Sequence, residues 1–477
     1  MRALSRLSLA ASLAVLAAHA MAEPRPPEGR PGLVVVISVD QFSANLFAEY
    51  RRHVTGGLLR AQQGVVFPLA YQGHATTETC PGHSTILTGR YPAHTGIVAN
   101  DWIADRAGHA NQLVYCVEDE SRPGTDATHY VVSADHLRGP TLGDLLKQAS
   151  PASRVVSVAG KDRAAVLLGG HSADQTWWWN GSRFASYPGR AEPVAVAEAN
   201  RHISTALAVA DNGIVPDALC RDHGGAIPLG NRVVGDGRFV RGAGDTRAFR
   251  ASPALDGATL DLVGRLIDEL QLGRRSATDL LAIGLSATDY VGHTYGAGGQ
   301  EMCLNILALD AALERLFEKL DRAGLSYVTV LTADHGGTDV PERSRDRAIP
   351  AADRIPAALS AEAVGLRVGR SLGLARPVLF GGPTANYWLD RSLRSPQRAR
   401  ALELVRAELA RMPEVETVFT RAEILRQPFP TGAPDTWSVL ARVRASYDPE
   451  RGGDLYVVPR PLITPLADAT GAYAAMH

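Results

Sequence analysis

Three aspartates in this chain have the types of neighbour that metal ligands need, and two of them are followed closely by a histidine. Asp289 and His293 are four residues apart, so on a helix both side chains lie on one face and can bind one cation. Asp334 and His335 are adjacent, and Asp40 supplies a further carboxylate. Such oxygen and nitrogen ligands suit zinc better than magnesium or calcium. Each residue alone is typical of a turn or a helix cap, but together they indicate a metal centre.

The segment from residue 77 to residue 89 reads Thr-Glu-Thr-Cys-Pro-Gly-His-Ser-Thr-Ile-Leu-Thr-Gly. Because proline favours the first turn of a helix, Pro81 places Thr79 at or near a helix N-cap. The N–H groups and the dipole of a helix start attract anions such as phosphate. Locally, the pattern is equally that of a plain capping threonine. A threonine hydroxyl bound to a metal differs from a capping hydroxyl in its acidity. A divalent ion lowers the pKa of bound water from about 15.7 to about 7, and it could form a threonine alkoxide in the same way.

Cysteine chemistry offers an alternative reading of the same segment, with Cys80 as a nucleophile and His83 as its base. No third residue that would orient the histidine is evident. The chain has four cysteines, at positions 80, 116, 220 and 303, and none has CxxC spacing. An even number suits two disulfides in an exported protein, and the sequence leaves all three pairings open.

Apolar segments rich in β-branched residues predict buried strands that alternate with helices. We expect strands at 33–39, 154–158, 279–285 and 327–331, and helices at 41–53 and 301–323. This alternation predicts an α/β fold with a three-layer α/β/α core and a mainly parallel central sheet. The three aspartates named above follow the carboxyl ends of three of these strands, where open α/β sheets bind their ligands.

Weaker periodicity predicts insertions over this core, near 101–150, 172–255 and 340–435. Within the last one, Ser395 is a suitable N-cap and Pro396 a suitable first residue for a helix that ends at Met412. Residues 415–419 after it are typical of a strand. The Trp177–Trp179 run could form an aromatic wall over a ligand, but we favour a role in the core of an insertion.

The first 22 residues are typical of an export signal. Arg2 and Arg6 form a basic start, residues 7–18 are apolar, and residues 20–22 form an Ala-Met-Ala cleavage site. A membrane anchor is the alternative, but the apolar run is too short to span a bilayer. We therefore expect a mature chain of residues 23–477 that is periplasmic or secreted and has no membrane span.

The composition narrows the kind of partner. Of 477 residues, 45% are hydrophobic and 21% charged, which excludes a coiled coil, a collagen-like chain and a wholly disordered protein. The 49 basic and 50 acidic residues give a formal net charge of −1. This balance argues against nucleic acid or an anionic membrane as the main partner. An anionic substrate would have to be bound by metals or a few well-placed cations.

Several motifs in order resemble the alkaline phosphatase superfamily. They are the segment at 77–85, the Thr-Gly-Arg-Tyr-Pro-Ala-His-Thr-Gly-Ile segment at 88–97, and Asn-Asp-Trp at 100–102. The Lys-Asp-Arg segment at 161–163, followed by Gly-His at 170–171, makes the chain most similar to the phosphate-irrepressible bacterial alkaline phosphatases. Nucleotide pyrophosphatase/phosphodiesterases are their relatives. The resemblance runs from about residue 33 to the C-terminus.

The resemblance implies a role for each candidate residue and two zinc ions per chain. Thr79 would be the nucleophile and a ligand of one zinc, together with Asp40, Asp334 and His335. Asp289 and His293 would hold the second zinc. A third histidine is expected for that site, and His477 is the candidate if the chain lacks its final strand. Asn100, Lys161 and Arg163 would contact the phosphoryl oxygens, where negative charge spreads during transfer.

The main choice is between monoesters and diesters. A monoester carries more negative charge on its non-bridging oxygens, and Lys161 and Arg163 could neutralise it. The resemblance implies that the diesterase relatives lack this Lys-x-Arg pair and use an apolar pocket instead. We therefore favour a monomeric phosphomonoesterase that forms a phosphothreonine and acts on small phosphate monoesters. The alternatives are a phosphodiesterase or phosphonate-cleaving enzyme of the same superfamily, and a metal-stabilised binding protein without activity.

Overall fold

The computed structural model describes residues 29–476, apart from 107–108, 123–124, 383–384 and 470–472. The export signal expected at 1–22 and the candidate ligand His477 therefore lie outside the described residues. None of the helices in the described ranges has the length and the apolar character that a membrane crossing requires.

The central sheet has six strands, and its predicted core is confirmed. Five strands are parallel, in the order β10 (Tyr327–Thr332), β1 (Leu33–Val39), β9 (Asp279–Leu285), β4 (Val155–Ala159) and β5 (Gln175–Trp179), and β6 (Phe184–Ala185) is antiparallel to β5. The Trp177–Trp179 run is thus the body of β5. All three tryptophans are buried in apolar clusters, so they belong to the core of the central sheet and form no ligand wall.

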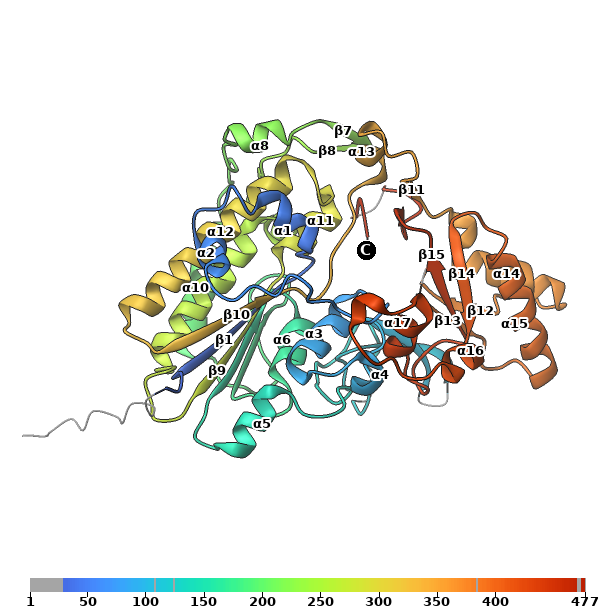
Figure 1. Ribbon diagram of the computed structural model, residues 1–477, viewed down its shortest axis with the longest axis horizontal. Coiled ribbons are helices and arrows are strands. Elements are labelled where there is room, and N and C mark those ends of the chain that lie inside the picture. Colours follow the sequence, from blue (N-terminus) through green and yellow to red (C-terminus); the bar gives the residue numbers. More distant parts are fainter. Residues whose placement is uncertain (1–28, 107–108, 123–124, 383–384, 470–472, 477) are drawn as a thin grey trace, which may run out of the picture.

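Helices cover both faces of this sheet, as an α/β fold requires (Figure 1). Val35 and Ile37 of β1 pack in one cluster with α7 (Val194–Leu207), α10 (Pro253–Glu269) and α12 (Gly299–Arg322). Val36 faces the other way, in a cluster with α3 (Thr79–Thr88), α5 (Leu142–Ala149) and α6 (Asp162–Gly169). Apolar residues on both sides of each strand explain the continuous apolar runs in the sequence.

Two predicted helix starts were wrong, each for a local reason. The helix expected from Gln41 is α1 (Ala44–Tyr50), because Ser43 accepts a hydrogen bond from the Leu46 amide as its N-cap. Gln41 lies before it in a turn with a φ of 64°. The helix expected to be capped by Ser395 is α15 (Ser395–Leu409), whose N-cap is Arg394, so Pro396 is its second residue. It ends at Leu409, before the predicted last residue Met412.

A second, antiparallel sheet lies apart from the first one (Figure 1). Its order is β12 (Leu379–Gly381), β13 (Ala385–Leu389), β15 (Leu455–Pro459) and β14 (Val415–Thr420). Together with α14 (Ala361–Ser371) and α15, it encloses an apolar cluster of its own. Three of these strands lie in the segment at 340–435, which we predicted as an insertion.

The remaining described elements are shorter connections. They are α2 (Gly57–Gln62), α4 (Pro92–Thr95), β2 (Asp101–Arg106), β3 (His109–Tyr115), α8 (Ala218–Asp222), β7 (Ile227–Leu229), β8 (Arg232–Val234), α9 (Thr246–Arg250), α11 (Ala287–Tyr295), α13 (Pro341–Asp346), β11 (Asp353–Arg354), α16 (Arg421–Arg426), α17 (Val439–Ser446) and β16 (Ile463–Thr464), with short 3₁₀ turns at Ala357–Leu359 and Pro434–Thr436.

Two disulfides use all four cysteines. Cys80 pairs with Cys116, and Cys220 on α8 pairs with Cys303 on α12. The alternative of a Cys80 nucleophile is therefore wrong, because its sulfur is already bonded and carries no thiolate.

The start of α11 is fixed by a buried carboxylate on α10. Asp256 accepts hydrogen bonds from the backbone amides of Ser286 and Ala287, at 2.8 and 2.9 Å. These amides begin the helix that carries Asp289 and His293, so Asp256 holds two candidate metal ligands in place. Burial, together with the nearby charge of Asp40, raises the pKa of Asp256 to about 7, although the two amide hydrogen bonds oppose this shift.

We expect Asp256→Ala to lower the free energy of unfolding by about 1–3 kcal/mol, since two buried amides lose their acceptor. Chemical denaturation of the two proteins measures the difference. Asp261→Ala on the same helix is the matched control. Asp261 is about half exposed and pairs with Arg265 on the surface, so its loss should cost less than about 1 kcal/mol.

The cost of Asp256→Ala should depend on pH. The pKa of Asp256 is higher in the folded chain than the value of about 3.9 expected when unfolded. The folded state therefore binds more protons between about pH 4 and pH 7, and the contribution of Asp256 to stability falls as the pH rises through this window. Asp256→Ala should cost more at pH 5 than at pH 8. An equal cost at both pH values would contradict the assignment.

Candidate active site

The three predicted carboxylates meet at the carboxyl edge of the central sheet. Asp40 follows β1, Asp334 follows β10, and Asp289 lies in the first turn of α11, just after β9. All three are at most 1% exposed. Parallel neighbouring strands end at the same edge, which is why residues almost 300 positions apart converge here.

The ligand atoms form two overlapping groups that could hold cations. Asp40, Asp289 and His335 make one group, and Asp40, His83 and Asp334 make the other, with the atoms of each group within 4.8 Å of one another. Three buried carboxylates this close together are costly unless cations balance them. The donor set of oxygens and imidazole nitrogens therefore fits divalent metals such as zinc.

Lys161 is the ammonium nearest to these carboxylates. Its Nζ lies 2.7 Å from Asp40 Oδ2 and 2.5 Å from Asp289 Oδ2, and it donates to Thr79 Oγ1 at 3.2 Å. Lys161 is 2% exposed. Burial lowers the pKa of Lys161, but Asp289 and Asp40 outweigh burial and keep the pKa above its usual value. The side chain is thus a fixed positive charge beside the candidate nucleophile.

The histidines differ in their surroundings. His335 Nε2 lies 3.3 Å from both Asp40 Oδ1 and Asp334 Oδ2. Burial opposes its protonation, yet these carboxylates raise the pKa of His335 to about 9. His293 Nε2 lies 3.2 Å from Asp289 Oδ1, and its Nδ1 is 2.8 Å from the Ala475 carbonyl. The C-terminal segment that leads to His477 therefore runs beside His293.

Two residues of this centre were missed from the sequence. His83 is fully buried, and its Nδ1 lies 3.0 Å from Asp334 Oδ2. Its position one turn after Thr79 on α3 was a usable signal, because residues four apart share a helix face. Gln41 donates its backbone N–H to Asp334 Oδ1 and its Nε2–H to Asp289 Oδ1. No motif marks Gln41, because its role depends on the positive φ of the turn after β1.

Thr79 is the first residue of α3, and its N-cap is Glu78. The prediction placed Thr79 at or near the N-cap, and it lies one residue inside the helix. Its side chain is 1% exposed. The hydroxyl therefore sits at a helix start, beside the Lys161 ammonium, where a phosphoryl group would meet the favourable end of the helix dipole.

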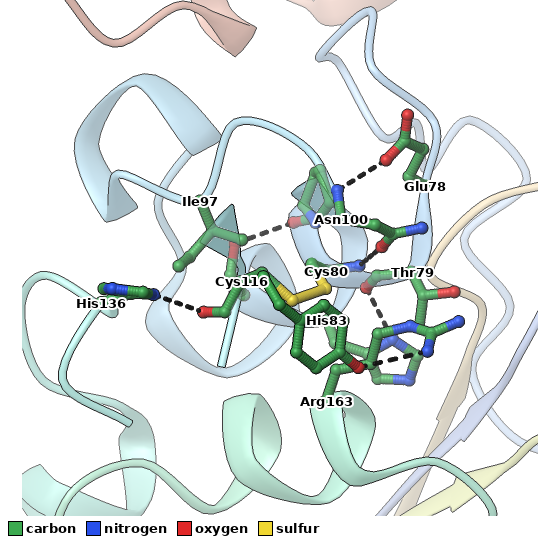
Figure 2. The surroundings of a disulfide bond; sticks show 12 residues. Glu78, Thr79, Cys80, His83, Ile97, Asn100, Cys116, His136 and Arg163 are labelled. Atoms are coloured by element: carbon green, nitrogen blue, oxygen red, sulfur yellow. Dashed lines mark hydrogen bonds between the residues drawn. A yellow bond between two sulfur atoms is a disulfide. The ribbon is translucent and has the colours of Figure 1, made fainter. Parts of the chain in front are cut away.

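Asn100 is held beside Thr79 by three hydrogen bonds (Figure 2). Its Oδ1 accepts from the Cys80 amide at 2.9 Å, its backbone N–H donates to Glu78 Oε2 at 2.6 Å, and its carbonyl accepts from the Cys116 amide at 2.9 Å. The Cys80–Cys116 disulfide joins the two amides covalently. Because Oδ1 is occupied, the amide group of Asn100 keeps its Nδ2 donors available for a ligand oxygen.

Arg163 is placed next to Lys161 by the start of α6, whose N-cap is Lys161. Its Nη1 donates to the Tyr115 hydroxyl at 3.3 Å, and that hydroxyl donates to Asp162 Oδ1. Tyr130 donates to the other oxygen of Asp162. The two tyrosines therefore occupy the neighbouring carboxylate, which leaves Arg163 without a salt bridge to Asp162.

We expect zinc binding to release protons. Zinc needs a neutral imidazole, and His335, with a pKa of about 9, is mostly protonated at pH 7.5. Titration calorimetry in buffers of different ionisation enthalpy should show the release of about one proton from His335. The number should fall as the pH rises above 9. His335→Gln should lose this proton, whereas a matched change at the exposed His129 should not.

Comparison with known proteins agrees with this geometry. Residues 34–477 match the family model described as type I phosphodiesterase / nucleotide pyrophosphatase. The chain is 48% identical to alkaline phosphatase PhoK of Sphingomonas sp., over 91% of this chain and 78% of that protein. It is 44% identical to alkaline phosphatase PhoD of Zymomonas mobilis, over 93% of this chain and 78% of that protein.

A solved structure shows the same fold. The crystal structure of alkaline phosphatase PafA aligns with a TM-score of 0.80 at 24% identity, covering 94% of this chain and 88% of that one. The alkaline phosphatase-like α/β fold predicted from the motifs is therefore confirmed. The family match over nearly the whole described chain and the level of identity lead to one assignment: the chain belongs to the type I phosphodiesterase / nucleotide pyrophosphatase family, within the alkaline phosphatase superfamily.

Proposed function

We propose that this chain is a zinc-dependent alkaline phosphatase that hydrolyses a broad range of phosphate monoesters through a phosphothreonine at Thr79. The observation that carries the proposal is the position of Thr79. Its hydroxyl is buried at the start of α3, 3.2 Å from Lys161 Nζ, and Lys161 in turn contacts two of the candidate metal ligands. The two relatives above, named alkaline phosphatases, support the same activity.

The candidate ligands divide between two zinc ions. Asp40, Asp334 and His335 would hold one ion beside Thr79, and Asp289 and His293 would hold the other, with His477 as a further ligand. When bound, zinc would lower the pKa of the threonine hydroxyl and neutralise charge on the phosphoryl oxygens. The two overlapping groups at the sheet edge support two neighbouring cation positions, although these groups pair His335 with Asp289 and His83 with Asp334.

In the proposed reaction, Thr79 Oγ1 forms a bond to phosphorus while the bond from phosphorus to the ester oxygen breaks. The proton that the Thr79 hydroxyl loses ends on the alcohol that leaves, and the phosphoryl group stays on Thr79. Water then attacks the phosphothreonine, which releases inorganic phosphate and restores the hydroxyl. Lys161, Arg163 and the Nδ2 of Asn100 would donate to the three non-bridging oxygens, where charge concentrates during both steps.

The charge of this donor set favours monoesters over diesters. Lys161 and Arg163 are two cations, and Asn100 adds a neutral donor. A monoester at alkaline pH has the negative charge to match both cations, whereas a diester replaces one anionic oxygen with an ester group. A phosphodiesterase or nucleotide pyrophosphatase remains the alternative, because the family model carries that description.

The N-terminal segment and the two disulfides support a proposal for the location of the protein in the cell. We propose that residues 1–22 are a cleaved export signal and that the mature chain is periplasmic or secreted, as a monomer. Two disulfides within one chain are typical of an oxidising compartment outside the cytosol.

The first test compares kcat/KM for p-nitrophenyl phosphate and bis-p-nitrophenyl phosphate, before and after removal of metal by a chelator. We expect a preference for the monoester that is lost on chelation and restored by zinc. A preference for the diester would support the alternative function. Activity that persists in the chelator would overturn the two-metal proposal.

The variants Lys161→Ala and Arg163→Ala sharpen this test. Removal of one donor that stabilises the transition state costs about 10²–10³ in kcat. We expect this loss with the monoester and a smaller one with the diester. Lys147→Ala is the matched control, because Lys147 forms its salt bridge with Asp174 and has no contact with the site. An equal loss for both esters would show that the two cations do not select monoesters.

A further prediction concerns Thr79 as the nucleophile. Thr79→Ala should lower kcat by about 10⁴-fold or more, as removal of a covalent nucleophile does in other hydrolases. Thr79→Ser should keep part of the activity, because it keeps the hydroxyl. Acid quenching after mixing with labelled substrate, followed by peptide mass spectrometry, should find phosphate on Thr79 in the native chain. Phosphate on another residue would contradict the assignment.

A further inference from the structure

A cavity lies beside α11, the helix that carries Asp289 and His293. It has a volume of about 260 Å³, and its polar lining comprises Arg232, Asp245, Arg247, Arg250, Tyr290 and Tyr295. Tyr290 and Thr294, which also lines the cavity, are four residues apart on one face of α11. Asp289 and His293 occupy the adjoining face of the same helix. The cavity and the metal centre are therefore separated by a single helix face.

Two aromatic side chains form walls that the cavity and the active site share. Lys161 Nζ lies 5.0 Å from the centre of the Tyr290 ring, and the Arg250 guanidinium lies 4.5 Å from the same centre. Tyr473 also lines the cavity, and its ring centre is 5.0 Å from that of His293. Tyr290 therefore contacts both Lys161, the neighbour of Thr79, and Arg250 of the cavity.

The cavity lining contains more basic than acidic side chains. Three arginines and one aspartate line it. The carboxylate of Asp245 accepts a hydrogen bond from the Ala248 amide as the N-cap of α9. The side chains of Arg247 and Arg250 make no hydrogen bond or salt bridge with any residue in the described part of the chain. Burial, and then the nearby charges of Arg247 and Arg354, lower the pKa of Arg232.

We propose that this cavity binds a second anionic group of the substrate, a phosphate or carboxylate remote from the phosphoryl group that is transferred. Arg250 is the main contact, because it is stacked on Tyr290 and so held with its donors beside the active site. A planar guanidinium fits the oxygens of such a group with paired hydrogen bonds. The preferred substrates are then bisphosphates and other monoesters with a distant anion. This inference rests on the proposed function and adds a substrate class to it.

The test measures the ratio of kcat/KM for fructose 1,6-bisphosphate to kcat/KM for fructose 6-phosphate. We expect Arg250→Ala to lower this ratio about tenfold, the effect of one charge-assisted hydrogen bond. The ratio for Arg250→Lys should lie between the ratios for the native chain and for Arg250→Ala. Lysine keeps the positive charge but cannot form the paired hydrogen bonds of a guanidinium. Arg411→Ala is the control for charge, because Arg411 is exposed, has no side-chain partner among the described residues and lies on the connection to β14. It should leave the ratio unchanged.

Binding to the Thr79→Ala variant separates this inference from the proposed function. Calorimetry should show tighter binding of the bisphosphate than of the monophosphate, and Arg250→Ala in the same background should remove the difference. If the native chain hydrolyses neither ester but this difference is present, the proposed function fails and the cavity assignment stands. If both sugars bind equally, or if Arg250→Ala weakens both sugars and free inorganic phosphate alike, the cavity is not a subsite for a second anionic group.

Discussion

The structure depends on how it balances three buried carboxylates at one sheet edge. Asp40, Asp289 and Asp334 follow the ends of three neighbouring parallel strands and are almost inaccessible to water. The repulsion among them is large at this depth, and neighbouring basic side chains supply positive charge that opposes it. Lys161 bridges two of them, and His335 has a pKa raised to about 9. A site that already draws protons and an ammonium this strongly has the electrostatic field that divalent cations need.

Most strands of the central sheet and most candidate metal ligands could be predicted from the sequence, but the residues and strands that surround them could not. Apolar runs predicted β1, β4 and β9, because strands buried on both faces leave few alternatives, and they also predicted β10, in which Val328 and Val330 are about half exposed. Strand β5 was not predicted, because the Trp-Trp-Trp run was placed in an insertion, although tryptophan favours strands. Of the second sheet only β14 was predicted, because its other strands are short and the pairing of β13 with β15 joins residues about 70 positions apart. Gln41 could not be predicted, because its contacts depend on how two other strands end.

The sequence left the pairing of the four cysteines open, and the structure shows that the Cys80–Cys116 disulfide helps to position Asn100. Its two half-cystines donate their amides to the two oxygens of Asn100, and Glu78 accepts the Asn100 amide. Burial raises the pKa of Glu78, although the hydrogen bond from Asn100 opposes this shift. Asn100 is thus constrained on three sides before any ligand arrives. A donor held in this way loses little entropy on binding, which favours catalysis by preorganisation.

The overall charge of the chain and the charge of its site lead to different expectations for a phosphate-binding protein. A formal net charge of −1 gives no long-range attraction for anions. The cations are instead gathered around Tyr290. Burial raises the pKa of Tyr290, although Lys161, Arg163 and Arg250 oppose this shift. These three side chains come from two separate elements, the α6 start and α9. Recognition therefore has to occur at contact distance, where charge geometry can separate a monoester from a diester and one substrate anion from two.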